Sequence, residues 1–178
     1  MTSLARALAP VAIFLAMATS VPVKAQDYAD VPLAKLQETA ASEHPSALYV
    51  LASRLFDTGA RSDAVFWYYA GQLRYRIHLQ CNPDLAPDGD PALFGALSEV
   101  IGNEINRYAF GDVEALAGTL EAVVEWDEAT ENPINPREKC PEAHMEVVSG
   151  LQDLRGYLLE NVDLIRDERE QAGLDNTW

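Results

Sequence analysis

Apolar residues recur at helical intervals along most of the chain, and the pattern is clearest between residues 45 and 81. One stripe of a first helix carries Leu48, Leu51, Ala52 and Leu55. Gly59 can take the left-handed conformation that ends this helix, and Ser62 is expected to cap a second one. The second helix has apolar residues on two neighbouring stripes: Ala64, Phe66, Tyr68, Ala70, Gly71, Leu73, Tyr75 and Ile77. Such a helix is packed on more than one side, so this region predicts a helical hairpin at the centre of the fold.

The same periodicity predicts further helices around the hairpin. They are expected at 31–42, from 90 to about 102, and at 112–126. After Cys140 the longest helix should bury an apolar stripe formed by Met145, Val148, Leu151, Leu154, Leu158, Val162 and Ile165. The sequence therefore predicts an all-α fold, a small bundle of about five to six helices with a long C-terminal helix.

The hairpin resembles a single tetratricopeptide helix–turn–helix unit. The resemblance is carried by the spacing of Leu48, Leu51, Ala52, Leu55, Gly59, Ala64, Tyr68 and Gly71. Leu48 stands where that family prefers Trp, and Arg76 stands where it has its closing Pro. The unit covers roughly 34 residues, and no second unit aligns, so a superhelical array is not expected. The resemblance implies protein–protein recognition through an inner groove.

The first 25 residues have the pattern of a secretory signal peptide. Arg6 precedes an apolar run at 7–18, and small residues lead to an expected cut between Ala25 and Gln26. A membrane-spanning helix, the rival interpretation, needs about 20 apolar residues, which this run does not reach. We therefore expect a signal peptide at 1–25, one helical domain at 26–171 and a frayed tail at 172–178, with the mature protein periplasmic or secreted and no longer in a membrane.

The chain is strongly acidic, with a formal net charge of −15. Loss of the two basic residues of the predicted signal peptide would leave 11 Lys and Arg against 28 Asp and Glu, a charge of −17. Such a field repels nucleic acid and anionic membranes and attracts a basic protein. The rival interpretation is that the acidity serves only to keep an exported protein soluble.

Cys81 and Cys140 are the only cysteines, and export would place them where thiols oxidise. We expect a disulfide between them. Metal binding is the rival, but two isolated cysteines fall short of a zinc pattern. The acidic loop with Asp84, Asp88 and Asp90 lacks the ligand spacing of a calcium loop, and turn formation and capping explain these residues. The sequence thus predicts no metal and no cofactor.

No catalytic motif is found. His44, His78 and His144 lie on three separate segments, and none has a catalytic spacing to a nucleophile or an acid. There is no glycine-rich phosphate loop and no nucleophile elbow. We expect no enzyme activity; the alternative is a periplasmic hydrolase whose catalytic residues are dispersed along the chain.

The most informative polar feature is a group of basic, aromatic and amide side chains on the second hairpin helix, which we call the basic–aromatic island. It consists of Trp67, Tyr69, Gln72, Arg74, Arg76 and His78. Guanidinium groups beside aromatic rings suit capture of a carboxylate or phosphate, or an interface anchor. The rival interpretation is internal pairing with Glu99, Glu104 or Asp163. The sequence predicts an exported protein-binding module that neutralises or scaffolds a basic partner, and it gives no indication of oligomeric state.

Overall fold

The computed structural model describes residues 28–176, and within this range the chain is helical and contains no strand. The elements are α1 (Leu33–Thr39), the 3-10 turn η2 (Ala40–Ser42), α2 (Ser46–Asp57), α3 (Arg61–Cys81), α4 (Asp90–Ala109), α5 (Val113–Ala129), α6 (Pro141–Glu160) and α7 (Val162–Gln171). The all-α prediction is confirmed, with seven α-helices in this range where five to six were expected. The predicted signal peptide and its cut between Ala25 and Gln26 lie outside the described residues.

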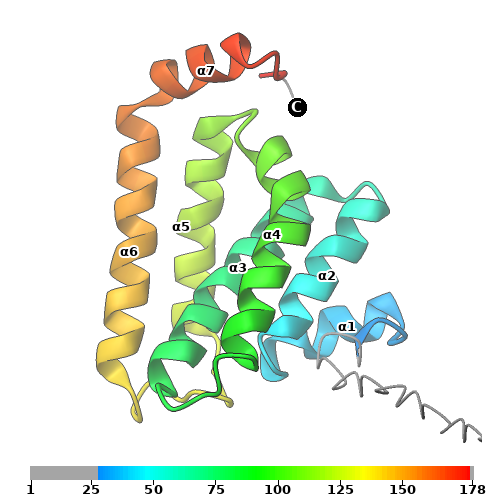
Figure 1. Cartoon of the computed structure of the whole chain (residues 1–178), viewed down its shortest axis with the longest axis vertical. Coiled ribbons are helices and arrows are strands. Elements are labelled where there is room, and N and C mark those ends of the chain that lie inside the picture. Colours follow the sequence, from blue (N-terminus) through cyan, green and yellow to red (C-terminus); the bar gives the residue numbers. More distant parts are fainter. Residues whose placement is uncertain (1–27, 177–178) are drawn as a thin grey trace, which may run out of the picture.

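Helix α3 is the centre of the bundle. It contacts α2, α4, α5 and α6 (Figure 1). Its largest buried side chains include Leu73, Arg74, Tyr75 and Ile77. The sequence correctly places this helix at the centre, because apolar residues on two stripes need partners on more than one side.

Two glycines allow other helices to approach α3 closely. A Cβ at Gly71 would lie 3.0 Å from Cδ2 of Tyr49 and 3.3 Å from Cβ of Leu48, both on α2. A Cβ at Gly102, on α4, would overlap the hydroxyl of Tyr68. The prediction that α4 ends near Gly102 is therefore wrong: this glycine permits helix packing, and α4 continues to Ala109.

The predicted helix ends are confirmed in part. Gly59 has a φ of 88°, as expected of a residue that ends α2. Asp112 caps α5, because its Oδ1 accepts a hydrogen bond of 2.9 Å from the amide of Ala115. Ser62 is not the cap of α3, which begins at Arg61 after Ala60 without a side-chain cap.

The long C-terminal helix expected from the sequence is two helices. Asn161 separates α6 from α7, and its side-chain amide donates a hydrogen bond of 2.7 Å to the carbonyl of Tyr157. Asparagine favours such local bonds over helix continuation. Helix α7 turns across the start of α5 (Figure 1). There Arg169 donates to the carbonyl of Arg107, near the end of α4, and to the carbonyl of Asp175. Asp175, in the segment expected to fray, thus lies against α7.

Helix α6 leaves part of its apolar stripe uncovered. It packs on α5 and on part of α3, and its buried residues are His144, Val147 and Leu158. Met145 keeps 69% of its surface exposed, and Leu151 and Leu154 are only partly buried. The expectation that this helix buries the whole stripe is wrong: among the described residues Met145 is exposed, and Val148, Leu151, Leu154 and Val162 are only partly buried against the core.

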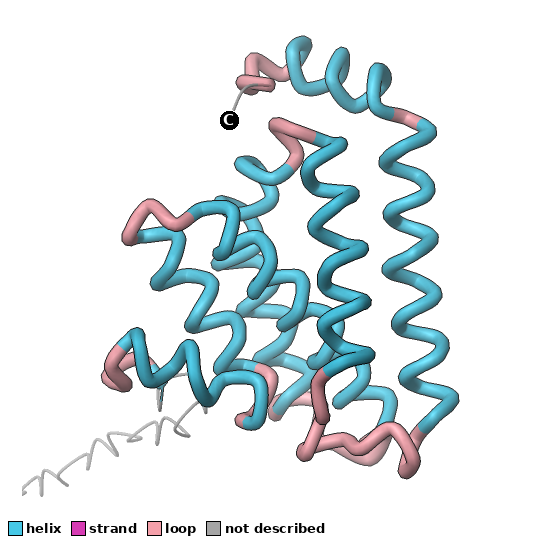
Figure 2. The backbone as a smooth tube through the Cα atoms, turned by 180° about the vertical axis from the view of Figure 1, so that it is seen from behind, coloured by secondary structure: helices cyan, strands magenta, loops and turns pink. Residues whose placement is uncertain are grey.

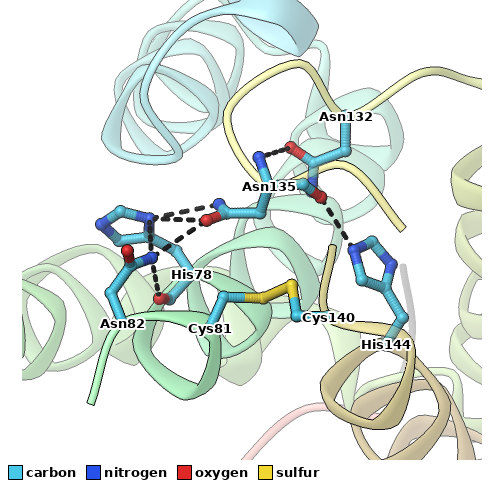
Figure 3. The surroundings of a disulfide bond; sticks show 7 residues. All are labelled: His78, Cys81, Asn82, Asn132, Asn135, Cys140 and His144. Atoms are coloured by element: carbon cyan, nitrogen blue, oxygen red, sulfur yellow. Dashed lines mark hydrogen bonds between the residues drawn. A yellow bond between two sulfur atoms is a disulfide. The ribbon is translucent and has the colours of Figure 1, made fainter. Parts of the chain in front are cut away.

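The Cys81–Cys140 disulfide is present and joins the end of α3 to the start of α6 (Figure 3). It lies at the end of the bundle where loops 82–89 and 130–140 meet (Figure 2). None of the described helices is both long and apolar enough to span a membrane.

Removing the disulfide should lower the free energy of unfolding substantially. The bridge joins residues 59 apart in sequence, and closing a loop of that size stabilises a chain by about 4 kcal/mol in the chain-entropy model. Urea denaturation of the Cys81→Ser/Cys140→Ser variant, compared with the oxidised protein, measures the loss. A reducing agent should shift the transition of the native protein and leave that of the variant unchanged; equal transitions for both proteins without reductant would contradict this assignment.

Candidate functional site

The residues of the basic–aromatic island lie on three different sides of α3, each in contact with other parts of the fold. Trp67 and Arg74 face α5, His78 faces the start of α4 and the loop before α6, and Tyr69, Gln72 and Arg76 face a groove beside α6. The six residues therefore do not form one binding surface.

Arg74 is an internal structural residue. Its Nε lies 2.5 Å from Oδ1 of Asp127, and both side chains are almost completely buried. Its two terminal nitrogens each donate a 3.0 Å hydrogen bond, to the carbonyls of Thr130 and Glu131. Its guanidinium also lies 4.7 Å from the centre of the Trp126 ring, which packs edge-on against Trp67. The internal-pairing interpretation therefore holds for Arg74, with Asp127 as its acid in place of Glu99, Glu104 or Asp163.

The charge of Arg74 is balanced within the fold. Burial lowers the pKa of Arg74, and the carboxylate of Asp127 acts in the opposite direction. Arg137, which is partly exposed, lies 3.0 Å from the other carboxylate oxygen of Asp127. An arginine that is buried and paired in this way does not present its charge at the surface.

His78 belongs to a buried polar cluster at the end of the bundle. Its Nε2 lies 3.2 Å from Oδ2 of Asp90, the first residue of α4. Its Nδ1 lies 3.3 and 3.1 Å from the amide oxygen and nitrogen of Asn135 (Figure 3). On the other side of Asp90, Nε2 of His44 lies 3.3 Å from Oδ1. Sequence spacing does not reveal this cluster, because its members come from four segments: the turn before α2, α3, the start of α4 and the loop before α6.

The third side of α3 borders a groove of about 1250 Å³, which is bounded by α3, the end of α4 and α6. The island residues Tyr69, Gln72 and Arg76 line it on the α3 side. Both Nε and Nη2 of Arg76 donate to Oε1 of Gln72, at 3.2 and 3.1 Å, and the hydroxyl of Tyr69 donates to Asn106 at 2.9 Å. Arg76 is exposed, so its charge remains available in the groove.

The opposite wall comes from α6, which the sequence analysis treats only as a core helix. Its lining residues combine apolar and acidic side chains: Met145, Val147, Leu151 and Leu154, with Glu142, Glu146 and Asp153. Among the described residues that line the groove, Arg76 is the only one with a positive charge. The signal in the sequence is the stripe itself, because apolar residues mixed with acids on one helix are also typical of a groove wall.

Three side chains, Ser46, His44 and Asp90, lie next to one another in the arrangement of a Ser–His–Asp triad, which the sequence does not reveal. Oγ of Ser46 lies 2.9 Å from Nδ1 of His44, whose Nε2 is the atom facing Asp90. Ser46 has 0% of its surface exposed. A nucleophile must reach its substrate, so this arrangement gives the hydrolase alternative no accessible serine.

Two groups of side chains in the described part of the chain have metal-binding donors close together. One is Cys81, Cys140 and His144, and the other is His44, His78 and Asp90. In the first group both sulfurs are joined in the disulfide, so neither is a thiolate that could bind a metal. The imidazole of His144 instead lies 2.9 Å from the carbonyl of Asn135 (Figure 3).

Comparison with known proteins gives limited information. No protein-family model matches the chain, and no solved structure matches it. An uncharacterized protein of Haemophilus influenzae is 32% identical over 91 residues, which are 51% of this chain and 35% of that protein. The chain thus spans well under two thirds of the relative it matches, and the similarity assigns no reaction or ligand.

Replacing Arg74 with Met should destabilise the fold strongly. The variant leaves the carboxylate of Asp127 buried with only Arg137 beside it, and loss of one partner of a buried pair costs about 3 to 5 kcal/mol. The matched control is Arg155→Met, which removes a partly exposed arginine lying 2.9 Å from Glu121 and should cost less than about 1 kcal/mol. Urea denaturation measures both. Similar losses for the two variants would show that Arg74 is not a central support of the fold.

Proposed function

We propose that the protein is an exported binding module that takes a basic, amphipathic helix of another protein into the groove between α3 and α6. The observation that carries this proposal is the partly uncovered section of the apolar stripe of α6 that borders the groove. Met145 is largely exposed, and Leu151 and Leu154 line a groove whose other wall includes Tyr69 and Leu73. An apolar helix face laid into such a groove removes both surfaces from water.

The charges of the groove favour a basic partner. Glu142, Glu146 and Asp153 line the α6 wall, and the rest of the molecule is strongly acidic. Lys and Arg residues on either side of the apolar face of a partner helix would meet these carboxylates. Charge of this kind increases the association rate and selects against acidic partners.

Arg76 would give the bound helix a direction. It lies on the α3 side of the groove, opposite the acids of α6. The C-terminal end of a helix carries partial negative charge on its last carbonyls. A partner helix whose C-terminal end, or whose single carboxylate, meets Arg76 would be favoured over the reverse orientation.

The tetratricopeptide resemblance and the disulfide support this proposal in different ways. The close approach of α2 to Gly71 fits a small-residue position of the repeat-like hairpin, and that family binds proteins. The disulfide fits an oxidising compartment such as the periplasm or the extracellular medium. Binding of this kind would neutralise or scaffold a basic partner protein, without a cofactor.

Reversing charges in the groove should weaken binding of a basic helix. The probe is a fluorescent amphipathic peptide of Lys and Leu, with a Glu and Leu peptide as its counterpart, and anisotropy is the measurement. We expect the basic peptide to bind and the acidic one not to bind. The Glu146→Lys/Asp153→Lys variant should lose at least about tenfold in affinity, because two attractive contacts become repulsive.

A matched control separates the groove from the general acidity of the protein. Glu99→Lys/Glu104→Lys changes the net charge by the same amount on exposed residues of α4, which line a different depression of the surface. This variant should retain most of the affinity. Equal losses in both double variants, or no binding by the native protein, would refute the groove as the docking site.

A further inference from the structure

We infer that His44, His78 and Asp90 form a binding site for one divalent transition-metal ion, with Zn²⁺ as its simplest occupant. The inference does not depend on the groove or on its partner. His44 lies between η2 and α2, His78 on the last turns of α3, and Asp90 at the start of α4. An ion at this point would join three segments at one end of the bundle.

The distances fit coordination of a single ion. Nε2 of His44 lies 3.3 Å from Oδ1 of Asp90, and Nε2 of His78 lies 3.2 Å from Oδ2. The donor atoms of the three residues all lie within 4.8 Å of one another. Ligands that bind zinc at about 2.1 Å in a tetrahedral arrangement are about 3.4 Å apart. Small side-chain movements therefore suffice to enclose an ion.

The far side of each imidazole is held by a partner that suits a metal ligand. A histidine that binds a metal through Nε2 carries its proton on Nδ1 and donates it to an acceptor. Oγ of Ser46, 2.9 Å from Nδ1 of His44, and the amide oxygen of Asn135, 3.3 Å from Nδ1 of His78, are in position to accept those protons. Without an ion, Nδ1 of His44 accepts a 3.4 Å hydrogen bond from the backbone amide of Ser46, so ion binding requires this ring to change tautomer. Both groups also can donate, so the same neighbours satisfy the rings when their Nε2 protons bond to Asp90.

The carboxylate is supported as well. The hydroxyl of Tyr75 donates to Oδ1 of Asp90 at 3.2 Å. Asp90 is also in the first turn of α4, where the helix dipole favours a negative charge.

Burial and donor type indicate which class of ion would bind. Both histidines have 8% of their surface exposed, and the Asp90 side chain has 13%. The site is thus largely shielded from water, and three protein ligands leave the fourth position of a tetrahedral ion for a water molecule. Two imidazoles and one carboxylate suit zinc and neighbouring transition metals, whereas Ca²⁺ and Mg²⁺ prefer oxygen ligands.

The three ligands are not evident from the sequence, because their spacing along the chain matches no metal-binding pattern. Asp90 is explained there as a turn and capping residue, and His44 and His78 as isolated histidines. Folding brings these three together because α2 and α4 both pack against α3. The site assigns a ligand role to residues that have no part in the groove.

Calorimetric titration of the untagged, oxidised protein with Zn²⁺, after treatment with a chelator, tests the site. We expect one ion per chain and a rise in thermal stability. Asp90→Asn and His44→Gln should each lower the affinity at least about tenfold, since each removes a ligand. His144→Gln is the matched control: His144 is also buried and bonded to Asn135, but it lies outside the proposed site.

A second measurement needs no variant and holds even if a substitution prevents folding. The chain has 3 histidines, whose ring nitrogens are resolved in long-range nitrogen–proton NMR spectra. On addition of Zn²⁺ the Nε2 signals of His44 and His78 should move to the values of metal-bound nitrogen, while those of His144 stay in place. Absence of saturable binding, equal affinity in all variants, or a shift of His144 would overturn the proposal.

Discussion

The buried charge of Arg74 is the constraint on which the arrangement of the other helices depends. A guanidinium on the central helix is costly to bury unless its charge is paired and hydrogen-bond acceptors surround it. Asp127 takes its charge, and the carbonyls of Thr130 and Glu131 take two further donors. These contacts fix the end of α5 and the first residues of the following loop against α3. The position of that loop is thus a consequence of satisfying one cation.

The position of the loop then determines what lies at this end of the bundle. Asn135, four residues beyond Glu131, reaches His78, Asn82 and His144, and Cys140 comes within bonding reach of Cys81 (Figure 3). The disulfide attaches the start of α6 to the end of α3, through Cys140, the residue just before α6. Farther along its length, α6 packs on α5. A helix held in this way borders α3 without filling the space beside it, which leaves the groove.

Local patterns predict the local parts of this fold. Periodicity indicates the helices, Asp112 indicates the start of α5, and two cysteines in a chain that is expected to be exported indicate the disulfide. The break at Asn161 is harder to predict, because apolar residues continue at helical spacing on both sides of it. The partner of Arg74 and the cluster around Asp90 are beyond such reasoning, since Asp127 and the histidines are distant in sequence and no local pattern pairs them. Local sequence patterns therefore do not predict which polar side chains pair with one another across helices.

The different fates of Arg74 and Arg76 explain how one helix supports the fold and also offers a binding surface. Both belong to the basic–aromatic island, and they lie two positions apart on α3, so they point to different sides of it. Arg74 meets a buried acid and becomes part of the core. Arg76 bonds to the neutral amide of Gln72 and keeps its charge in the groove, opposite carboxylates of α6 that it does not neutralise. A groove with separated charges of both signs favours a partner that carries complementary charges in one orientation.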